Sequence, residues 1–247
     1  MEMLVAGFFV YARLSGLFFV MPGFTSLPMI ARQALALPLS VVLIPAMHDL
    51  SMPSTVPFLV VGILGELLIG LSMGFITAIC VNALTVAGEI ISTNLGLGMA
   101  ALLDPMTHAR SDVLSTLCST FGVSLFLATD THLRCLEILG KSLHSVPPGT
   151  ILSPYVATPL VVEAAVTSIR VGAELAGPVV LFSLLTHLAI SLLGRMAPNL
   201  NLFFSLGLSL NVISGLGVVL IALPATLLAF LPNLDLLLMK LHTLVGL

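Results

Sequence analysis

Long apolar stretches without a charged residue follow one another along the chain. Because an α-helix of about 20 residues crosses the hydrocarbon core of a bilayer, these stretches are long enough for several membrane helices. We expect five or six hydrophobic helical segments in an all-α, polytopic membrane protein whose helices are broken or kinked by proline and glycine. The clearest charge-free stretches are residues 14–31, 67–88, 175–194 and 196–234.

In the first third of the chain, the pattern predicts helices near residues 3–20, 29–47 and 58–84. The third of these carries Gly62, Glu66, Gly70 and Gly74 at successive i+4 positions, so it has one close-packing face interrupted by an acid. Two interpretations of the acid remain open: it is protonated or bonded to a neighbouring helix, or it lies at a wet, charge-sensing position. Likewise, Arg13 in the first helix either snorkels or pairs with a carboxylate elsewhere.

The segment from Ala87 to Pro105 is too polar to insert into a membrane alone. Between residues 88 and 103 there are only six Ile or Leu residues, alongside Glu89, Ser92, Thr93 and Asn94. A charge at the centre of a membrane helix costs about 3 kcal/mol, whereas each Leu or Ile returns only about 0.3 to 0.6 kcal/mol. We therefore expect neighbouring helices or other subunits to cover this segment.

Residues 113–129 predict a short charge-free helix with a polar side, followed by an amphipathic helix that ends before Pro147-Pro148-Gly149. Asp130 is the expected N-cap of the amphipathic helix, and Glu137 and Lys141 form an i, i+4 pair on its polar face. A helix of this kind is expected to lie against a partner or at an interface.

The last third predicts a hairpin of two long apolar helices, near residues 169–196 and 202–230, joined at Ala197-Pro198-Asn199. In the second helix, Asn211 lies between two glycines at i+4 spacing. We expect it to bond a neighbouring helix and not a ligand.

Composition supports a membrane protein and excludes several other classes. Hydrophobic residues make up 58% of the chain and charged residues 8%, and mean hydropathy is +1.20. A net charge of −3 without a block of Lys or Arg argues against nucleic acid as a partner. The three cysteines have no metal-ligand spacing, and no common catalytic or nucleotide-binding motif occurs, so we expect no enzyme, metal or cofactor.

Two motifs, Ala87-Gly88-Glu89 through Leu103-Asp104-Pro105 and residues 194–201, give the chain a resemblance to the FliR/SctT family of type III export-gate proteins. Residues 125–132 and 142–149 are more similar to the flagellar branch than to the virulence branch. The order and spacing of the motifs carry the resemblance over nearly the full length.

The resemblance implies a non-enzymatic subunit of the export apparatus in the bacterial inner membrane, within the flagellar basal body. Its implied partners are FliP-like and FliQ-like gate subunits, with FlhB-like and FlhA-like components, and its cargo is unfolded export substrates. Residues 1–247 would form a single export-gate domain, with a FliP-like part at 1–150 and a FliQ-like helical hairpin within 151–247.

The resemblance also implies a plug that projects into the pore from residues 98–110, with Met99, Asp104, Pro105 and Met106 as candidate closing residues. Candidate inter-subunit packing or polar positions are Gly62, Glu66, Gly70, Gly74, Glu89, Arg195, Pro198 and Asn211.

Three other functions compete with the flagellar gate. A proton-coupled secondary transporter would use Glu66, Glu89 and His187 as its site, but we find no convincing internal repeat of the kind that transporters show. A virulence-type injectisome subunit would have the same gate role. A purely structural scaffold would support assembly without any closure.

Overall fold

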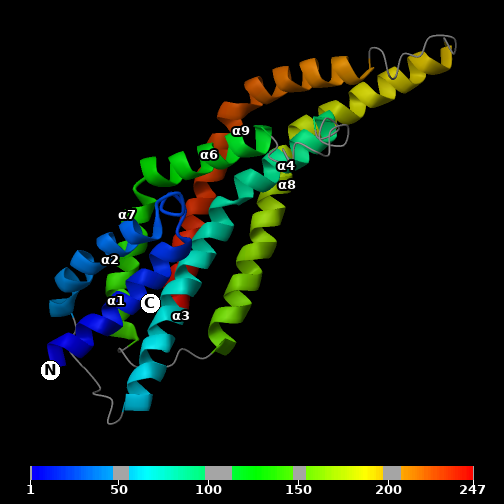
Figure 1. The fold of residues 1–247 in the computed structure, drawn as a ribbon. Coiled ribbons are helices and arrows are strands. Elements are labelled where there is room, and N and C mark those ends of the chain that lie inside the picture. The colour runs from blue at the N-terminus through cyan, green and yellow to red at the C-terminus, as the bar shows by residue number, and fades with distance from the viewer. Residues whose placement is uncertain (1, 47–55, 98–112, 147–153, 197–206, 247) are drawn as a thin grey trace. The chain divides into compact units, whose positions relative to one another are not determined.

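The computed structural model describes residues 2–46, 56–97, 113–146, 154–196 and 207–246. Every regular element in these ranges is helical, which confirms the all-α prediction (Figure 1). In chain order, the elements are α1 (Glu2–Val20), α2 (Met29–Leu43), the short 3-10 helix η1 (Ile44–Ala46), α3 (Val56–Val81), α4 (Ala83–Leu95), α6 (Val113–Ala128), α7 (Thr131–Ser145), α8 (Pro154–Met196) and α9 (Leu208–Val245).

Three helical runs in the described part of the chain are long and apolar enough to cross a membrane. They are Pro57–Leu95, Thr158–Met196 and Leu210–Val245. Helices α6 and α7 together supply a fourth if they count as one span, although they meet at a bend of 60°. The prediction of a polytopic membrane protein is confirmed.

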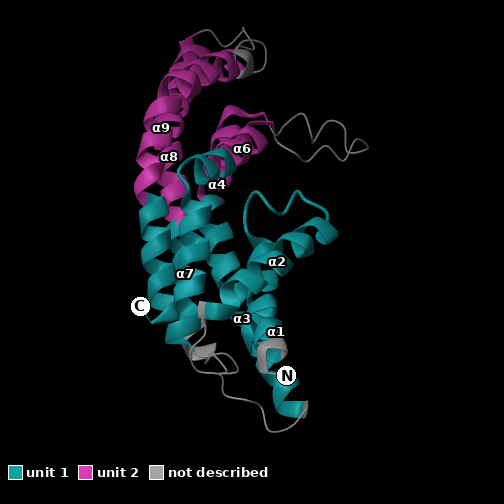
Figure 2. Cartoon of the chain, turned by 90° about the vertical axis from the view of Figure 1, so that its left-hand side faces the viewer, with its two compact units in different colours: residues 1–81, 123–167, 233–247 teal, residues 82–122, 168–232 magenta. Residues whose placement is uncertain are grey.

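The chain folds into two compact units (Figure 2). Unit 1 comprises Met1–Val81, Val123–Thr167 and Asn233–Leu247, and unit 2 comprises Asn82–Gly122 and Ser168–Pro232. Helices α6, α8 and α9 each contribute residues to both units. The FliP-like and FliQ-like parts that the resemblance implies, divided at residue 150, stay a prediction.

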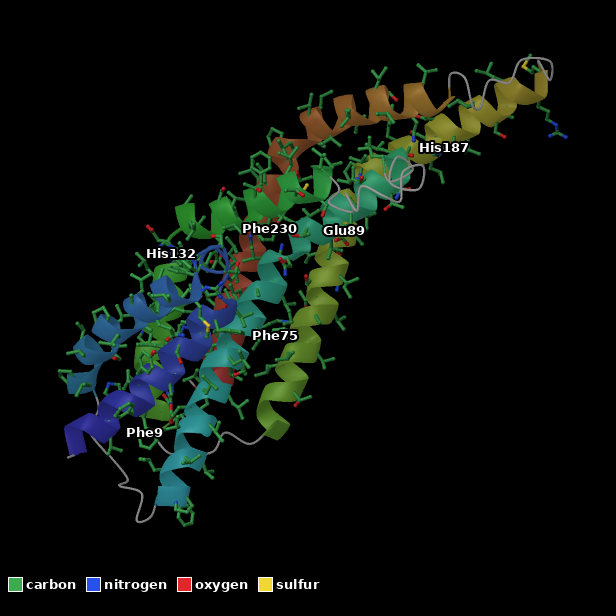
Figure 3. The ribbon with its side chains drawn as sticks, viewed as in Figure 1. Phe9, Phe75, Glu89, His132, His187 and Phe230 are labelled. Carbon is green, nitrogen blue, oxygen red and sulfur yellow. The ribbon has the colours of Figure 1, made fainter. Side chains whose placement is uncertain are left out.

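In unit 1, glycines allow α1 and α3 to pack with their backbones in contact. A Cβ atom at Gly70 would collide with the carbonyl oxygen of Arg13, and one at Gly74 would lie 2.7 Å from the carbonyl oxygen of Leu17. Both glycines come from the i+4 stripe on α3, so the part of the stripe nearest the end of α3 packs against α1 of the same chain. Phe9 of α1 is buried in this unit, whereas Phe75 of α3 is exposed (Figure 3).

In unit 2, α4 is packed against α6 and α8. A Cβ atom at Gly88 would lie 2.8 Å from the Cα of Ser115 in α6. One at Gly172 of α8 would lie 2.9 Å from the carbonyl oxygen of Ala83. A small apolar cavity of about 30 Å³ remains in the core of this unit beside Ala87 and Ile91.

The long C-terminal helices differ from the predicted hairpin. Helix α8 begins at Pro154 and not near 169, and α9 runs to Val245 and not to 230. Helix α9 continues through Pro224 and Pro232, although each proline removes one backbone hydrogen bond. Buried apolar residues recur every three or four positions beyond Pro224, and their packing outweighs the lost hydrogen bonds. That periodicity is visible at Phe230, Leu234, Leu237, Leu241 and Leu244.

The start of α7 is where the sequence predicts, but the capping hydrogen bond is absent. Asp130 has a φ of 55°, in the left-handed region that Asp tolerates better than most residues, and its side chain makes no cap bond to α7. Asp130 is therefore the N-cap residue of α7, as predicted, although its carboxylate makes no capping hydrogen bond. The predicted ion pair between Glu137 and Lys141 is confirmed, with Lys141 Nζ 2.7 Å from Glu137 Oε1 on the exposed face.

Candidate functional site

The C-terminal end of α4 precedes the predicted plug in the sequence. Gly96 has a φ of 79° and ends the helix in the left-handed conformation. The N–H groups of Gly96 and Leu97 donate to the carbonyl oxygens of Thr93 and Ser92, at 3.2 and 3.1 Å. These two bonds satisfy two of the carbonyl groups that a helix end leaves free, and the carbonyl of Asn94 is left for other donors.

Side chains from two other helices bond that carbonyl. The side-chain amide of Asn211 in α9 donates to the Asn94 carbonyl oxygen at 3.1 Å, and the hydroxyl of Ser183 in α8 lies 3.2 Å from the same oxygen. Ser183 Oγ also lies 3.3 Å from Asn211 Oδ1. Both side chains are only 1% exposed. We call Asn94, Ser183 and Asn211 the carbonyl clamp.

The small residues around Asn211 allow this approach. Gly215, one turn after Asn211, faces Leu95 so closely that a Cβ atom at Gly215 would collide with the Leu95 side chain. The glycine stripe of α9 therefore contacts the end of α4 in the same chain. His187, one turn after Ser183, places Nδ1 3.5 Å from the Ser183 hydroxyl and is otherwise exposed (Figure 3).

A second buried polar cluster, in unit 1, is built on an ion pair between α1 and α3. The Nε of Arg13 donates to Glu66 Oε2 at 2.6 Å, and both side chains are 0% exposed. The same guanidinium donates to Ser142 Oγ at 2.8 Å and to the carbonyl oxygen of Val146 at 3.1 Å. Of the interpretations that the sequence left open, the structure shows pairing for Arg13 and bonding to a neighbouring helix for Glu66.

This ion-pair cluster holds the C-terminal end of α7 against α1 and α3. A buried charge is tolerated only when its partners are in place, and Arg13 uses donors on all three of its nitrogens. The carbonyl of Val146 lies at the negative end of the α7 dipole, where a cation is favourable. Glu66 is thus engaged in structure, which argues against its use as the proton site of a transporter.

The remaining predicted positions are placed as follows. Gly62 is buried in α3, Glu89 is exposed on α4, and Arg195 is exposed in the last turn of α8. Pro198 and the four candidate plug residues, Met99, Asp104, Pro105 and Met106, lie outside the described residues. Among the described residues, no group of three or more His, Cys, Asp or Glu side chains could hold a metal ion.

Sequence reasoning missed Ser142 and Ser183, the two hydroxyls that complete these clusters. Ser142 lies on the apolar face of α7 between Leu139 and Leu143, and this position was a usable signal of burial. Ser183 precedes His187 by one helical turn within an apolar helix, which was a weaker signal of a polar contact.

These features define an integral membrane protein whose buried polar groups hold helices together. The sequence model of the bacterial export proteins, family 1, matches residues 4–236. The chain therefore belongs to this family, the FliR/SctT family, as the resemblance implied. Members of this family are non-enzymatic, and the chain is a component of the flagellar export apparatus in the bacterial inner membrane.

Curated relatives support the flagellar branch. The chain is 33% identical to the flagellar biosynthetic protein FliR of Caulobacter vibrioides over 218 residues, which cover 87% of this chain and 86% of the relative. It is 29% identical to FliR of Aquifex aeolicus, over 90% and 87% of the two chains. The secretion system apparatus protein SsaT of Salmonella typhimurium is 29% identical over 57% of this chain and 54% of its own length.

Proposed function

We propose that the chain forms part of the wall of the flagellar export conduit and that residues 98–110 close this conduit when no substrate passes. The observation that carries the proposal is the carbonyl clamp. Side chains from α8 and α9 fix the end of α4 immediately before residue 98. A closing segment needs a fixed base, because otherwise its position relative to the pore would vary.

The proposed partners are FliP-like and FliQ-like subunits in the gate, with FlhB-like and FlhA-like components beside it. Support comes from the large apolar side chains that α8 and α9 expose in unit 2. Subunit helices could cover these side chains, as the family assignment suggests. They include Leu181, Leu184, Leu188 and Leu192 on α8 and Ile213, Leu220, Ile221 and Leu228 on α9.

Deletion of residues 103–110 in flagellated cells tests the closing role. We expect the gate complex to assemble in nearly normal amounts while the inner membrane becomes permeable to small solutes. The matched control replaces the same residues with a Gly-Ser segment of equal length, which keeps the chain length but removes the methionine and the Asp-Pro pair. A deletion strain whose complex assembles but whose membrane is as impermeable as the parent's would show that these residues only support assembly.

A further inference from the structure

The exposed side chains change character within the single apolar run Pro57–Leu95. From residue 57 to residue 81, every exposed side chain is apolar. From residue 82 to residue 95, a stretch that is described in full, the exposed side chains are Asn82, Glu89 and Thr93. At about 100° per residue, spacings of seven and four place these three on one narrow side of the helix. We call them the polar edge of α4.

The other sides of α4 are covered within unit 2. Gly88 meets Ser115 and Cys118 of α6, and Val86 lies against Gly172 of α8. Leu95 and Asn94 contact α9 through Gly215 and the carbonyl clamp. The polar edge is therefore the side of α4 that unit 2 leaves open; Figure 3 labels Glu89 on this helix.

Among the described residues of unit 2, none forms an ion pair with Glu89. The two cations in the described part of this unit are Arg170, whose Nε lies 2.9 Å from Glu174 Oε1, and Arg195 in the last turn of α8. A carboxylate facing hydrocarbon costs at least about 2.5 to 3.5 kcal/mol, so lipid is excluded as the neighbour of this edge. Two neighbours remain, namely water and a cationic surface of another subunit.

The residue composition of the polar edge favours water as its neighbour. The centre of a subunit interface is about 65% apolar, whereas the three most exposed side chains of residues 82–95 are all polar, and the apolar residues of this stretch are buried or, as with Val86 and Ile90, only partly exposed. The Thr93 hydroxyl is already satisfied, because it donates to the carbonyl oxygen of Glu89 at 2.8 Å. A solvated edge needs no further partner, whereas a buried carboxylate would need a cation held in good geometry.

We infer that the polar edge of α4 faces the water-filled interior of the conduit, where Glu89 presents a fixed negative charge to the hydrated, unfolded substrate chain. This inference rests on the proposed function. It adds which face of the subunit lines the conduit.

Thiol accessibility in the assembled complex tests the inference. Cys80, Cys118 and Cys135 are first replaced by Ala, and motility confirms that this background works. Single thiols are then introduced as Glu89→Cys and Thr93→Cys. The controls are Ser92→Cys, fully buried on the same helix, and Ile213→Cys, 71% exposed on α9. A charged methanethiosulfonate is applied to both sides of membrane vesicles; the thiolate forms a mixed disulfide and releases methanesulfinate.

Because the thiolate is the reactive form and requires water, we expect Glu89→Cys and Thr93→Cys to react at least about tenfold faster than both controls. Two variants are used so that a folding defect in one does not decide the outcome. If both thiols react as slowly as the one from Ser92→Cys, the edge is covered in the complex and the inference is wrong.

Charge reversal at Glu89 distinguishes a polar edge that faces water from one that faces a cationic surface of another subunit. If the edge faces water, Glu89→Gln and Glu89→Lys should both yield normal amounts of the complex. Loss of the complex with Glu89→Lys but not with Glu89→Gln would reveal a cationic partner and overturn the inference. A leaky 103–110 deletion combined with unreactive edge thiols would leave the proposed closing role intact and reject only the lining role.

Discussion

The side-chain amide of Asn211 donates a hydrogen bond to the backbone carbonyl oxygen of Asn94, 117 residues earlier in the chain, at 3.1 Å. The bond joins the beginning of α9 to the end of α4, so a residue of the last helix holds a helix that ends 113 residues before α9 begins. The strength of this bond can be tested by substitution at Asn211 alone.

Asn211→Leu removes one of two donors to a buried carbonyl and places an apolar side chain beside it. We expect a loss of about 1 to 2 kcal/mol in stability, since a buried acceptor loses one partner and retains Ser183. Under the proposed function, the looser base of α4 should also raise solute leakage. Thermal denaturation of the purified complex and a permeability assay measure the two effects.

Ser214→Ala is the control for this substitution. Ser214 is half-buried about one turn from Asn211, and its hydroxyl donates within α9, to the Leu210 carbonyl oxygen. We expect no leakage and nearly unchanged stability. Equal behaviour of the two variants would show that the clamp does not hold α4.

The buried ion pair predicts a marked asymmetry between single and double substitutions. Arg13→Met or Glu66→Met alone leaves an unpaired buried charge and should cost about 3 to 5 kcal/mol. The double variant Arg13→Met, Glu66→Met removes both charges and should recover much of that loss. The amount of the chain retained in the membrane and the thermal stability of the complex report the difference.

Arg13→Lys refines the test of the ion pair. A lysine could keep the charge next to Glu66 but cannot reproduce the guanidinium contacts to both Ser142 and Val146. We expect an intermediate loss. If the double variant Arg13→Met, Glu66→Met is no more stable than either single variant, an unpaired buried charge is not the main reason that the single variants lose stability.

The close approach of α1 and α3 predicts that Gly70→Ala is destabilising. The new methyl group would overlap the Arg13 carbonyl oxygen, a backbone atom that cannot move independently of α1, so the two helices must separate at a cost of about 1 to 3 kcal/mol. Gly177→Ala is the matched control, because nothing lies within 4 Å of its added Cβ atom. That variant should be neutral or up to about 1 kcal/mol more stable, through its higher helix propensity.

Local pattern predicted most of the fold. The apolar stretches, their proline and glycine boundaries, and the Glu137–Lys141 pair are all set within a few residues of sequence. The start of α8 was misjudged because Glu163 interrupts the apolar pattern before residue 169. In the structure Glu163 is an exposed residue of one continuous helix.

Contacts between distant residues could not be predicted in the same way. The sequence identifies Arg13 and Glu66 as charges that need an explanation, but 53 residues separate them and nothing local selects one as the partner of the other. Asn211 was expected to bond another helix, but its acceptor is a backbone carbonyl. Every residue carries such a group, so side-chain patterns do not identify this one. The exposure of Glu89 likewise depends on which faces of α4 the surrounding helices cover.

The three-part construction of unit 1 constrains how the protein can be synthesised. Arg13 leaves the ribosome 133 residues before Val146, one of its acceptors, which is a delay on the order of 10 s at ordinary rates of translation. The buried residues Leu237, Leu241 and Leu244 of the same unit follow later still. The first unit to begin synthesis is therefore completed only when the last helix has been made, and until then Arg13 lacks its contacts to α7.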